Sequence, residues 1–240
     1  MNMDDLSSRF LAAFNAVEDW MRHELESDDV QDFGTLLRTL ERSNSVVHRH
    51  ARELRRLARL RNLIAHNHSR EKPLAVPTSL SVERAEAISI QLRSPPLLIE
   101  YAANPVELCR PSDPLGCCVK KMHDGVFSQL PIYDGQQYCG LLTAETIARW
   151  LATFFLGDGD GIVDEQTVAE VVQHQEDSEN YKFMAANATV TSALSAFEEF
   201  QRRGKRLEAI LITNLGRPTE TLRGIVTIQD IPKLNKAFNG

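Results

Sequence analysis

Two threonines at matching positions of a duplicated segment are the residues whose placement most directly indicates chemistry. Residues 140–147 read Gly-Leu-Leu-Thr-Ala-Glu-Thr-Ile, and residues 224–231, which begin 84 positions later, read Gly-Ile-Val-Thr-Ile-Gln-Asp-Ile. Each copy follows a strand-like run and opens a predicted helix. Thr143 and Thr227 therefore stand where free backbone N–H groups and the positive end of a helix dipole favour a phosphate. A duplicated unit of this kind predicts two halves that share one core, with a cleft between them.

The later copy adds a carboxylate. Asp230 lies one helical turn after the start of its helix, and it can accept hydrogen bonds from two neighbouring ribose hydroxyls while the adjoining apolar strands hold a purine face. The earlier copy has Thr146 at this position, so we expect one good nucleotide site per chain rather than two. The alternative needs no ligand: Thr143 and Thr227 only cap helices, and Asp230 complements the helix dipole.

The duplicated segments and their flanking runs resemble the tandem CBS domain, or Bateman module. The resemblance covers residues 97–240, with a first repeat at about 97–156, a linker helix at about 157–178 and a second repeat at about 179–240. It implies a β-α-β-β-α order in each repeat, and a pair of repeats that binds adenine nucleotides or related ligands in its clefts. The expected strands include residues 106–109, 127–134, 138–143, 181–184 and 208–214, and a strand from Gly224.

The amino-terminal third is predicted to be all helical. Apolar residues recur at helical spacing in four stretches, at residues 6–21, 33–40, 47–64 and 82–88. This pattern predicts an up-down four-helix bundle over residues 1–93, and two prolines after it predict a stiff junction to the repeats.

The third helical stretch ends in a second candidate site. Its segment 48–61 carries six arginines against one glutamate, and Arg61, Asn62 and His66 follow at its end. This placement resembles the R-x4-6-H motif of HEPN domains. The resemblance implies metal-independent RNA cleavage, in which His66 moves a proton, Arg61 holds charge on the phosphate and Asn62 orients one of them, usually across a two-fold dimer. The alternative is an inactive docking or dimerisation bundle whose basic residues satisfy the helix end.

Composition limits the remaining choices. The 240-residue chain has 42% apolar and 25% charged residues and a net charge of −6, as in ordinary globular proteins. Its start lacks the features of a secretion signal and no stretch is long and apolar enough for a membrane span, so a cytoplasmic protein without membrane contact is expected. Its four cysteines lack paired C-x-x-C spacing, so they are interpreted as mostly buried thiols and no metal is expected.

The sequence therefore predicts an α+β protein, with a HEPN-like four-helix bundle followed by a pair of CBS repeats. We expect a regulatory protein in which the repeats sense an adenine nucleotide, such as AMP, ADP or ATP, and control the helical domain. The alternative is a nucleotide-regulated ribonuclease that uses Arg61 and His66 and binds RNA through the basic helix 48–61. A module that binds nothing and only dimerises is a third reading. Both resembled families suggest a homodimer or a higher even-numbered oligomer.

Overall fold

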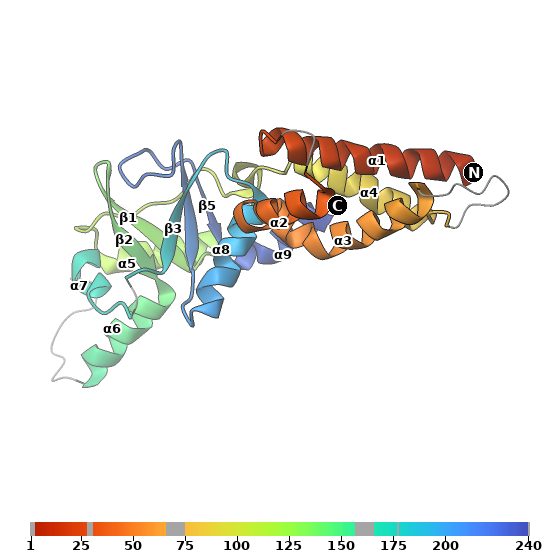
Figure 1. Cartoon of the computed structure of the whole chain (residues 1–240). Coiled ribbons are helices and arrows are strands. Elements are labelled where there is room, and N and C mark those ends of the chain that lie inside the picture. The colour runs from red at the N-terminus through yellow and green to blue at the C-terminus, as the bar shows by residue number, and fades with distance from the viewer. Residues whose placement is uncertain (1–2, 28–30, 66–74, 157–165, 177, 240) are drawn as a thin grey trace. The chain divides into compact units, whose positions relative to one another are not determined.

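The chain divides into two compact units, residues 1–96 and 97–240 (Figure 1). The computed structural model describes residues 3–27, 31–65, 75–156, 166–176 and 178–239. Within these ranges, no helix combines the length and the apolar character that crossing a membrane requires.

The described part of the first unit consists of helices α1 (Met3–Glu24), α2 (Phe33–Ser43), α3 (Ser45–Ala65) and α4 (Ser79–Arg93). One asparagine separates α2 from α3. The backbone N–H of Asn44 donates to Leu40 at the end of α2, while its side-chain oxygen accepts from the N–H groups of Val46 and Val47 at 2.9 and 3.1 Å. Asn44 therefore satisfies groups at two helix ends, and α3 can begin directly after α2.

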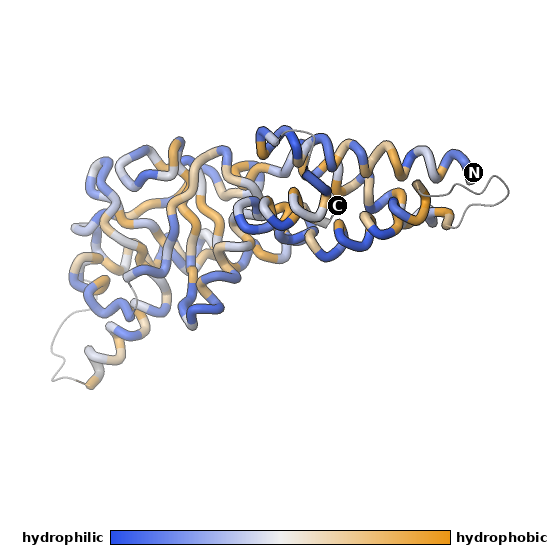
Figure 2. Tube along the Cα trace, viewed as in Figure 1, coloured by the Kyte–Doolittle hydropathy of each residue, from blue (hydrophilic) through white to orange (hydrophobic). Residues whose placement is uncertain are grey.

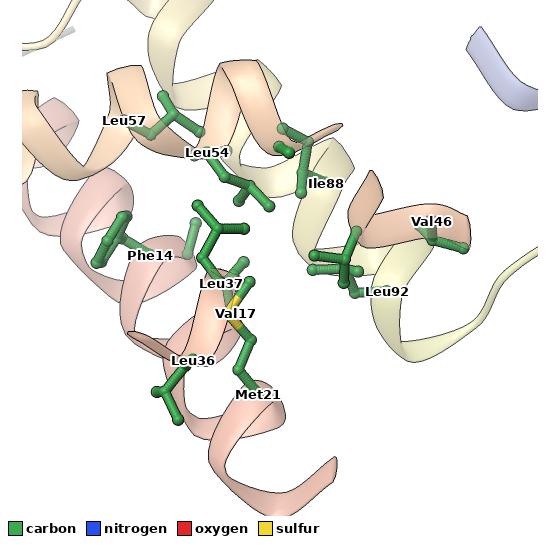
Figure 3. Packing of buried hydrophobic residues seen from close by; sticks show 14 of the residues in the cluster. Phe14, Val17, Met21, Leu36, Leu37, Val46, Leu54, Leu57, Ile88 and Leu92 are labelled. Atoms are coloured by element: carbon green, nitrogen blue, oxygen red, sulfur yellow. The ribbon is translucent and has the colours of Figure 1, made fainter. Parts of the chain in front are cut away.

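The four helices share one hydrophobic core (Figure 3). Each contributes the apolar face that its sequence spacing predicts, including Phe14 and Met21 from α1, Leu37 from α2, Leu54 from α3 and Ile88 from α4. These side chains are almost completely buried. The arginines of α3 lie on its other faces, since its buried residues are apolar. The arginines of segment 48–61 therefore lie toward the surface of the unit.

In the second unit, the first repeat contains α5 (Leu115–Gly125), the antiparallel strands β1 (Gln129–Asp134) and β2 (Gln137–Thr143), and α6 (Ala144–Leu156). The expected strand at residues 106–109 is wrong. Only a single parallel bridge forms there, between Cys109 and Ile132. Pro105 and Pro111 flank this segment, and because proline lacks an N–H group and has a fixed φ, a longer ladder is disfavoured.

The second repeat has the full predicted order. It contains β3 (Tyr181–Ala185), α8 (Val190–Arg202), β4 (Ala209–Thr213), β5 (Gly224–Thr227), a 3-10 turn η3 (Ile228–Asp230) and α9 (Ile231–Asn239). Its sheet has the order β3-β4-β5, with β3 and β4 parallel and β4 and β5 antiparallel. The strands are predominantly apolar (Figure 2), as expected for a sheet covered on both faces.

The sheets of the two repeats are joined by a shared apolar cluster. Leu141 of the first repeat packs in this cluster with Leu211 and Ile225 of the second. Aromatic rings extend it, since the ring of Tyr138 lies 4.7 Å from that of Tyr181, centroid to centroid, in an edge-to-face arrangement. The repeats therefore form one compact unit, as the duplication predicts.

The core of each repeat includes a segment that lies outside that repeat in sequence. The 3-10 helix η1 (Leu98–Tyr101) opens the first repeat, yet Leu98 lies in the core of the second. The short helix α7 (Val168–Val172) precedes the second repeat, yet Val168 and Val171 lie in the core of the first. The two cores of this unit therefore do not follow the order of the repeats in the sequence.

The helical linker is shorter than predicted in the described residues. Only α7 is helical between residues 166 and 176, and its first residue, Val168, follows Thr167, whose side chain and backbone form a capping box with Glu170. The N-cap of α7 is Thr167.

The two glycines of the duplicated segment are required for different reasons. Gly140 has a φ of +150°, which other residues rarely adopt. At Gly224 the constraint is space, because an added Cβ would lie 2.8 Å from the Cβ of Ala102. The segment at residues 97–103 passes this close because Ala103 bridges to Ile225.

Candidate ligand-binding site

Thr143 lies in a cleft between the two repeats. It ends β2, and its hydroxyl accepts from the N–H of Thr146 at 3.1 Å, so it caps α6 as predicted. The cleft has a volume of about 440 Å³ and is lined by Thr143, Glu145, Thr146, Arg149, Gln175, Glu176, Asn180, Gly204, Lys205, Arg206 and Glu208. The duplicated threonine of the first copy therefore faces residues of the second repeat, which the duplication alone did not identify.

The lining of this cleft contains three basic and three acidic side chains, and the basic ones pair with acids. Arg149 contacts Glu145 at 3.1 Å and also pairs with Glu176. Lys205 pairs with Glu179 at 2.8 Å. These side chains are between 40% and 76% exposed, and exposed ion pairs contribute only about 0–1 kcal/mol. An incoming anion can therefore exchange places with the acids at little cost.

The inner end of the cleft is buried and polar. Asn180 and Glu208 directly precede Tyr181 and Ala209, which are paired neighbours of the parallel strands β3 and β4. The carbonyl oxygen of Asn180 accepts from the N–H of Glu208 at 2.6 Å, so the two residues lie side by side. They are only 8% and 9% exposed.

Two amide groups of this cleft have unmet hydrogen-bonding capacity among the described residues. They are the side-chain oxygen of Asn180, which is an acceptor, and the side-chain nitrogen of Gln175, which is a donor. A buried polar atom without a partner costs about 1–3 kcal/mol. Such atoms at the wall of a cleft are the groups that a ligand would satisfy.

Burial also acts on the ionisable group at the inner end. It raises the pKa of the Glu208 carboxyl, and Arg206, which contacts it at 2.7 Å, opposes this effect only in part. Glu145 adds to the rise by repulsion. The carboxyl is therefore easier to protonate than an ordinary glutamate.

The second copy is arranged differently. Asp230 uses its Oδ2 atom to accept from the N–H of Thr227 at 2.8 Å and from the Thr227 hydroxyl at 3.1 Å. This is a capping box, and it brings Thr227 and Asp230 together as the alternative without a ligand requires. The Oδ1 atom takes no part in the box. The adjoining cleft, of about 510 Å³, is lined by Ile228 and Ile231 rather than by these two residues.

In the first copy, Thr146 stands where the second copy has Asp230, and its surroundings differ. Thr146 is 2% exposed, and its hydroxyl pairs with that of Thr143 at 2.9 Å. Both hydroxyls are therefore engaged with each other inside the fold. The first copy has the open polar cleft, whereas the second has the carboxylate.

In the helical unit, Arg61 and Asn62 line another cleft, of about 550 Å³. Arg59 also lines it, and Phe14 and Phe33 add an aromatic pair with ring centroids 4.6 Å apart. Arg61 donates to the side-chain oxygen of Asn62 at 3.4 Å. His66, the third residue of the predicted motif, lies outside the described residues, so the structure does not test the full motif.

The cysteines divide into two groups. Cys109 and Cys118 are buried in the first repeat, as expected, whereas Cys117 and Cys139 are exposed. Among the residues that the structure describes, no group of three or more histidine, cysteine or acidic side chains is placed to hold a metal ion.

Sequence reasoning missed most of the cleft. Gln175, Asn180, Lys205, Arg206 and Glu208 lie in turns or directly before strands, and they belong to no repeated motif. One signal was present, the basic run Arg202-Arg203-Gly204-Lys205-Arg206 at the end of the second repeat's first helix. A basic turn between a helix and a strand is a reasonable place to look for an anion contact.

Comparison with known proteins identifies part of this unit. The family model of the CBS domain matches residues 99–153, which include Thr143 and Thr146. This part of the chain matches the CBS domain family. No curated protein was found to match the chain.

Several solved structures that are described as CBS proteins are similar to the chain at low sequence identity. The CBS domain pair of protein MJ0100, in complex with 5-methylthioadenosine and S-adenosyl-L-methionine, is 17% identical over 59% of this chain and 97% of that chain, with a TM-score of 0.44. A CBS-domain containing protein from Agrobacterium tumefaciens is 19% identical over 57% and 94%, with a TM-score of 0.42. A hexameric CBS-CP12 protein from bloom-forming cyanobacteria is 17% identical over 58% and 67%, with a TM-score of 0.43.

Proposed function

We propose that the second unit binds an adenine nucleotide in the cleft beside Thr143 and thereby regulates the helical unit. CBS domains are known for adenine nucleotide binding and for regulation, and residues 99–153 match this family. The observation that carries the proposal is the cleft itself. It joins the capped start of α6 to the basic side chains of Lys205 and Arg206 in the second repeat.

The cleft provides the groups that a nucleotide requires. The start of α6 and these basic side chains favour the phosphates, since a helix N-terminus and basic side chains both attract negative charge. Two polar side chains of the lining offer hydrogen bonds to the nucleoside, Asn180 an acceptor and Gln175 a donor. A ligand there would contact both repeats, so its binding would favour one arrangement of the repeats over another.

Thr227 and Asp230 form a second proposed position for a nucleotide. The Oδ1 atom of Asp230 lies outside the capping box and is suited to accept a ribose hydroxyl. Asp230→Ala should weaken binding by about 1–3 kcal/mol if the ligand occupies this copy, and it should have no effect if the ligand occupies the cleft at Thr143.

The experiment compares threonine variants by thermal shift and calorimetry with AMP, ADP and ATP. Thr143→Ala and Thr227→Ala remove the two candidate threonines, and Thr78→Ala is the matched control, because Thr78 caps α4 in the helical unit by accepting from Ser81. Each variant should lose about 1 kcal/mol of helix stability. Only Thr143→Ala is expected to lose nucleotide affinity. The absence of a thermal shift with all three nucleotides in the unsubstituted chain would contradict the proposal.

We infer a second candidate function for the helical unit, a HEPN-like domain of the up-down bundle type that binds and cleaves RNA. The observation that favours it is that Arg59, Arg61 and Asn62 line one cleft together. Arginine side chains suit a phosphate backbone, and binding through them should weaken as salt rises. We also propose that the protein acts as a homodimer or a higher even-numbered assembly.

An RNA assay with matched arginine variants tests this function. Arg61→Ala and His66→Ala should abolish cleavage of single-stranded and structured RNA while nucleotide affinity is kept. Arg56→Ala is the control, since Arg56 is an exposed arginine of the same helix outside the cleft. An absence of cleavage over a broad RNA panel, with and without adenine nucleotides, would exclude the enzyme and leave a docking or dimerisation domain.

A further inference from the structure

The first copy of the duplicated segment lacks a carboxylate where the second copy has Asp230, and this raises the question of what replaces it. Thr146 occupies the position, but its hydroxyl is buried and pairs with Thr143 at 2.9 Å. It therefore offers no ready acceptor to a ligand. Any acceptor for ribose hydroxyls must come from elsewhere in the cleft.

Two buried acceptors lie side by side at its inner end. Asn180 and Glu208 precede paired residues of β3 and β4, and the backbone hydrogen bond between them is 2.6 Å long. Both residues are more than nine-tenths buried and both line the cleft. The side-chain oxygen of Asn180 has no hydrogen-bond partner among the described residues. Of the eight buried side-chain atoms without a partner among the described residues, only this oxygen and the Gln175 nitrogen belong to residues that line the cleft, and we take this coincidence as the sign of a ligand.

The other acids of the cleft are less suited to this role. Glu145 and Glu176 are about half or more exposed in their side chains and are paired with Arg149. Glu208 differs because its side chain is 11% exposed and its salt bridge to Arg206 uses the Oε1 atom, so its Oε2 atom lies outside that contact. One acceptor from each of two adjacent residues matches a ligand with two neighbouring hydroxyl donors.

We propose that Asn180 and Glu208 bind the 2′- and 3′-hydroxyls of the nucleotide ribose in the cleft beside Thr143. The second repeat thus supplies the acceptors that the first repeat lost at Thr146. This inference rests on the proposed nucleotide binding and extends it to specific residues. The phosphates then point toward the basic side chains of Arg149, Lys205 and Arg206.

The test uses the full chain, calorimetry and the tightest binder among AMP, ADP and ATP. The key variant is Asn180→Leu, with Asn187→Leu as the control at an exposed asparagine outside the cleft. Asn180→Leu should weaken binding about tenfold, whereas Asn187→Leu should not change it. Glu208→Gln should weaken binding as well, because the charged acceptor is lost.

A fold measurement separates this role from a structural one. Since the Asn180 oxygen is unpaired in the structure, removing it should leave the thermal midpoint of the nucleotide-free chain unchanged or higher. Weaker nucleotide binding together with a clearly lower midpoint would identify Asn180 as a structural residue and overturn the proposal.

Altered nucleotides identify the ligand group that is bound. The 2′-deoxy and 3′-deoxy forms of the same nucleotide should bind about tenfold more weakly to the unsubstituted chain, and at least one of these losses should disappear in Asn180→Leu. The purine riboside form, which lacks the 6-amino group, should not lose affinity through Asn180. If it does, the residue contacts the base amine instead and the proposal is wrong.

The outcomes distinguish the two levels of inference. If none of the three nucleotides binds the unsubstituted chain, the proposed function fails. If a nucleotide binds but Asn180→Leu or the deoxy forms bind as tightly, only the assignment of the ribose acceptors fails.

Discussion

The variant Leu98→Ala tests whether a segment at the start of the first repeat stabilises the core of the second. Leu98 has no exposed surface and lies in the core of the second repeat, although it belongs to the start of the first repeat in the chain. Replacing a fully buried leucine with alanine removes apolar contacts and leaves a cavity, and we expect a loss of about 3 kcal/mol within the usual range of about 2–5 kcal/mol. For a unit of this size, such a loss corresponds to a fall of about 6–12 °C in the thermal midpoint.

The assay follows urea unfolding by two signals. Trp150 lies in the core of the first repeat, so its fluorescence reports that repeat once Trp20 in the helical unit is replaced by phenylalanine. Because the cluster around Leu141 and Leu211 joins the two sheets, Leu98→Ala should shift the Trp150 transition as well. Leu215→Ala is the control, since Leu215 is 65% exposed and its loss should cost less than about 0.5 kcal/mol.

Two results would refute this reasoning. A loss below about 1 kcal/mol would mean that Leu98 is not packed as the structure shows. An unchanged Trp150 transition beside a shifted circular dichroism signal would mean that the repeats unfold separately, and that the exchanged segments do not make them one cooperative unit.

Further predictions concern Glu208, Gly224 and Thr227. Because burial raises the pKa of Glu208, the folded chain holds the carboxyl proton more tightly than the unfolded chain does. The free energy of unfolding should therefore fall as pH rises from the ordinary glutamate pKa of 4.5 through the raised pKa of the folded chain. Glu208→Gln should flatten this fall in urea titrations between about pH 4 and 8, and an unchanged slope would contradict it. Gly224→Ala should lower the free energy of unfolding by about 1–3 kcal/mol, because the added Cβ meets that of Ala102. Gly204→Ala is the comparison for backbone strain alone, since its φ is positive and its added Cβ meets nothing within 4 Å. Thr227→Ala should remove one half of the capping box with Asp230 and cost about 1 kcal/mol in denaturant unfolding.

The sequence by itself determined the elements whose signal is local. The apolar faces around Phe14, Leu37 and Leu54 define helices because their spacing follows the 3.6-residue period, and the core contains these faces. Thr143 caps a helix after a strand because capping depends on a few consecutive residues. The duplicated segments 140–147 and 224–231 are also local patterns of consecutive residues, and they predicted the paired repeats.

Tertiary structure alone decided which distant residues share a site. Asn180 and Glu208 are neighbours because β3 and β4 pair in parallel, and no local pattern specifies that pairing. Likewise, Leu98 serves the second repeat and Val168 the first, because burial depends on which surface is nearby in space rather than in sequence. The cleft beside Thr143 is lined by residues that only the tertiary structure brings together. Thr143 was therefore predictable from its motif, whereas the buried acceptors Asn180 and Glu208 were not.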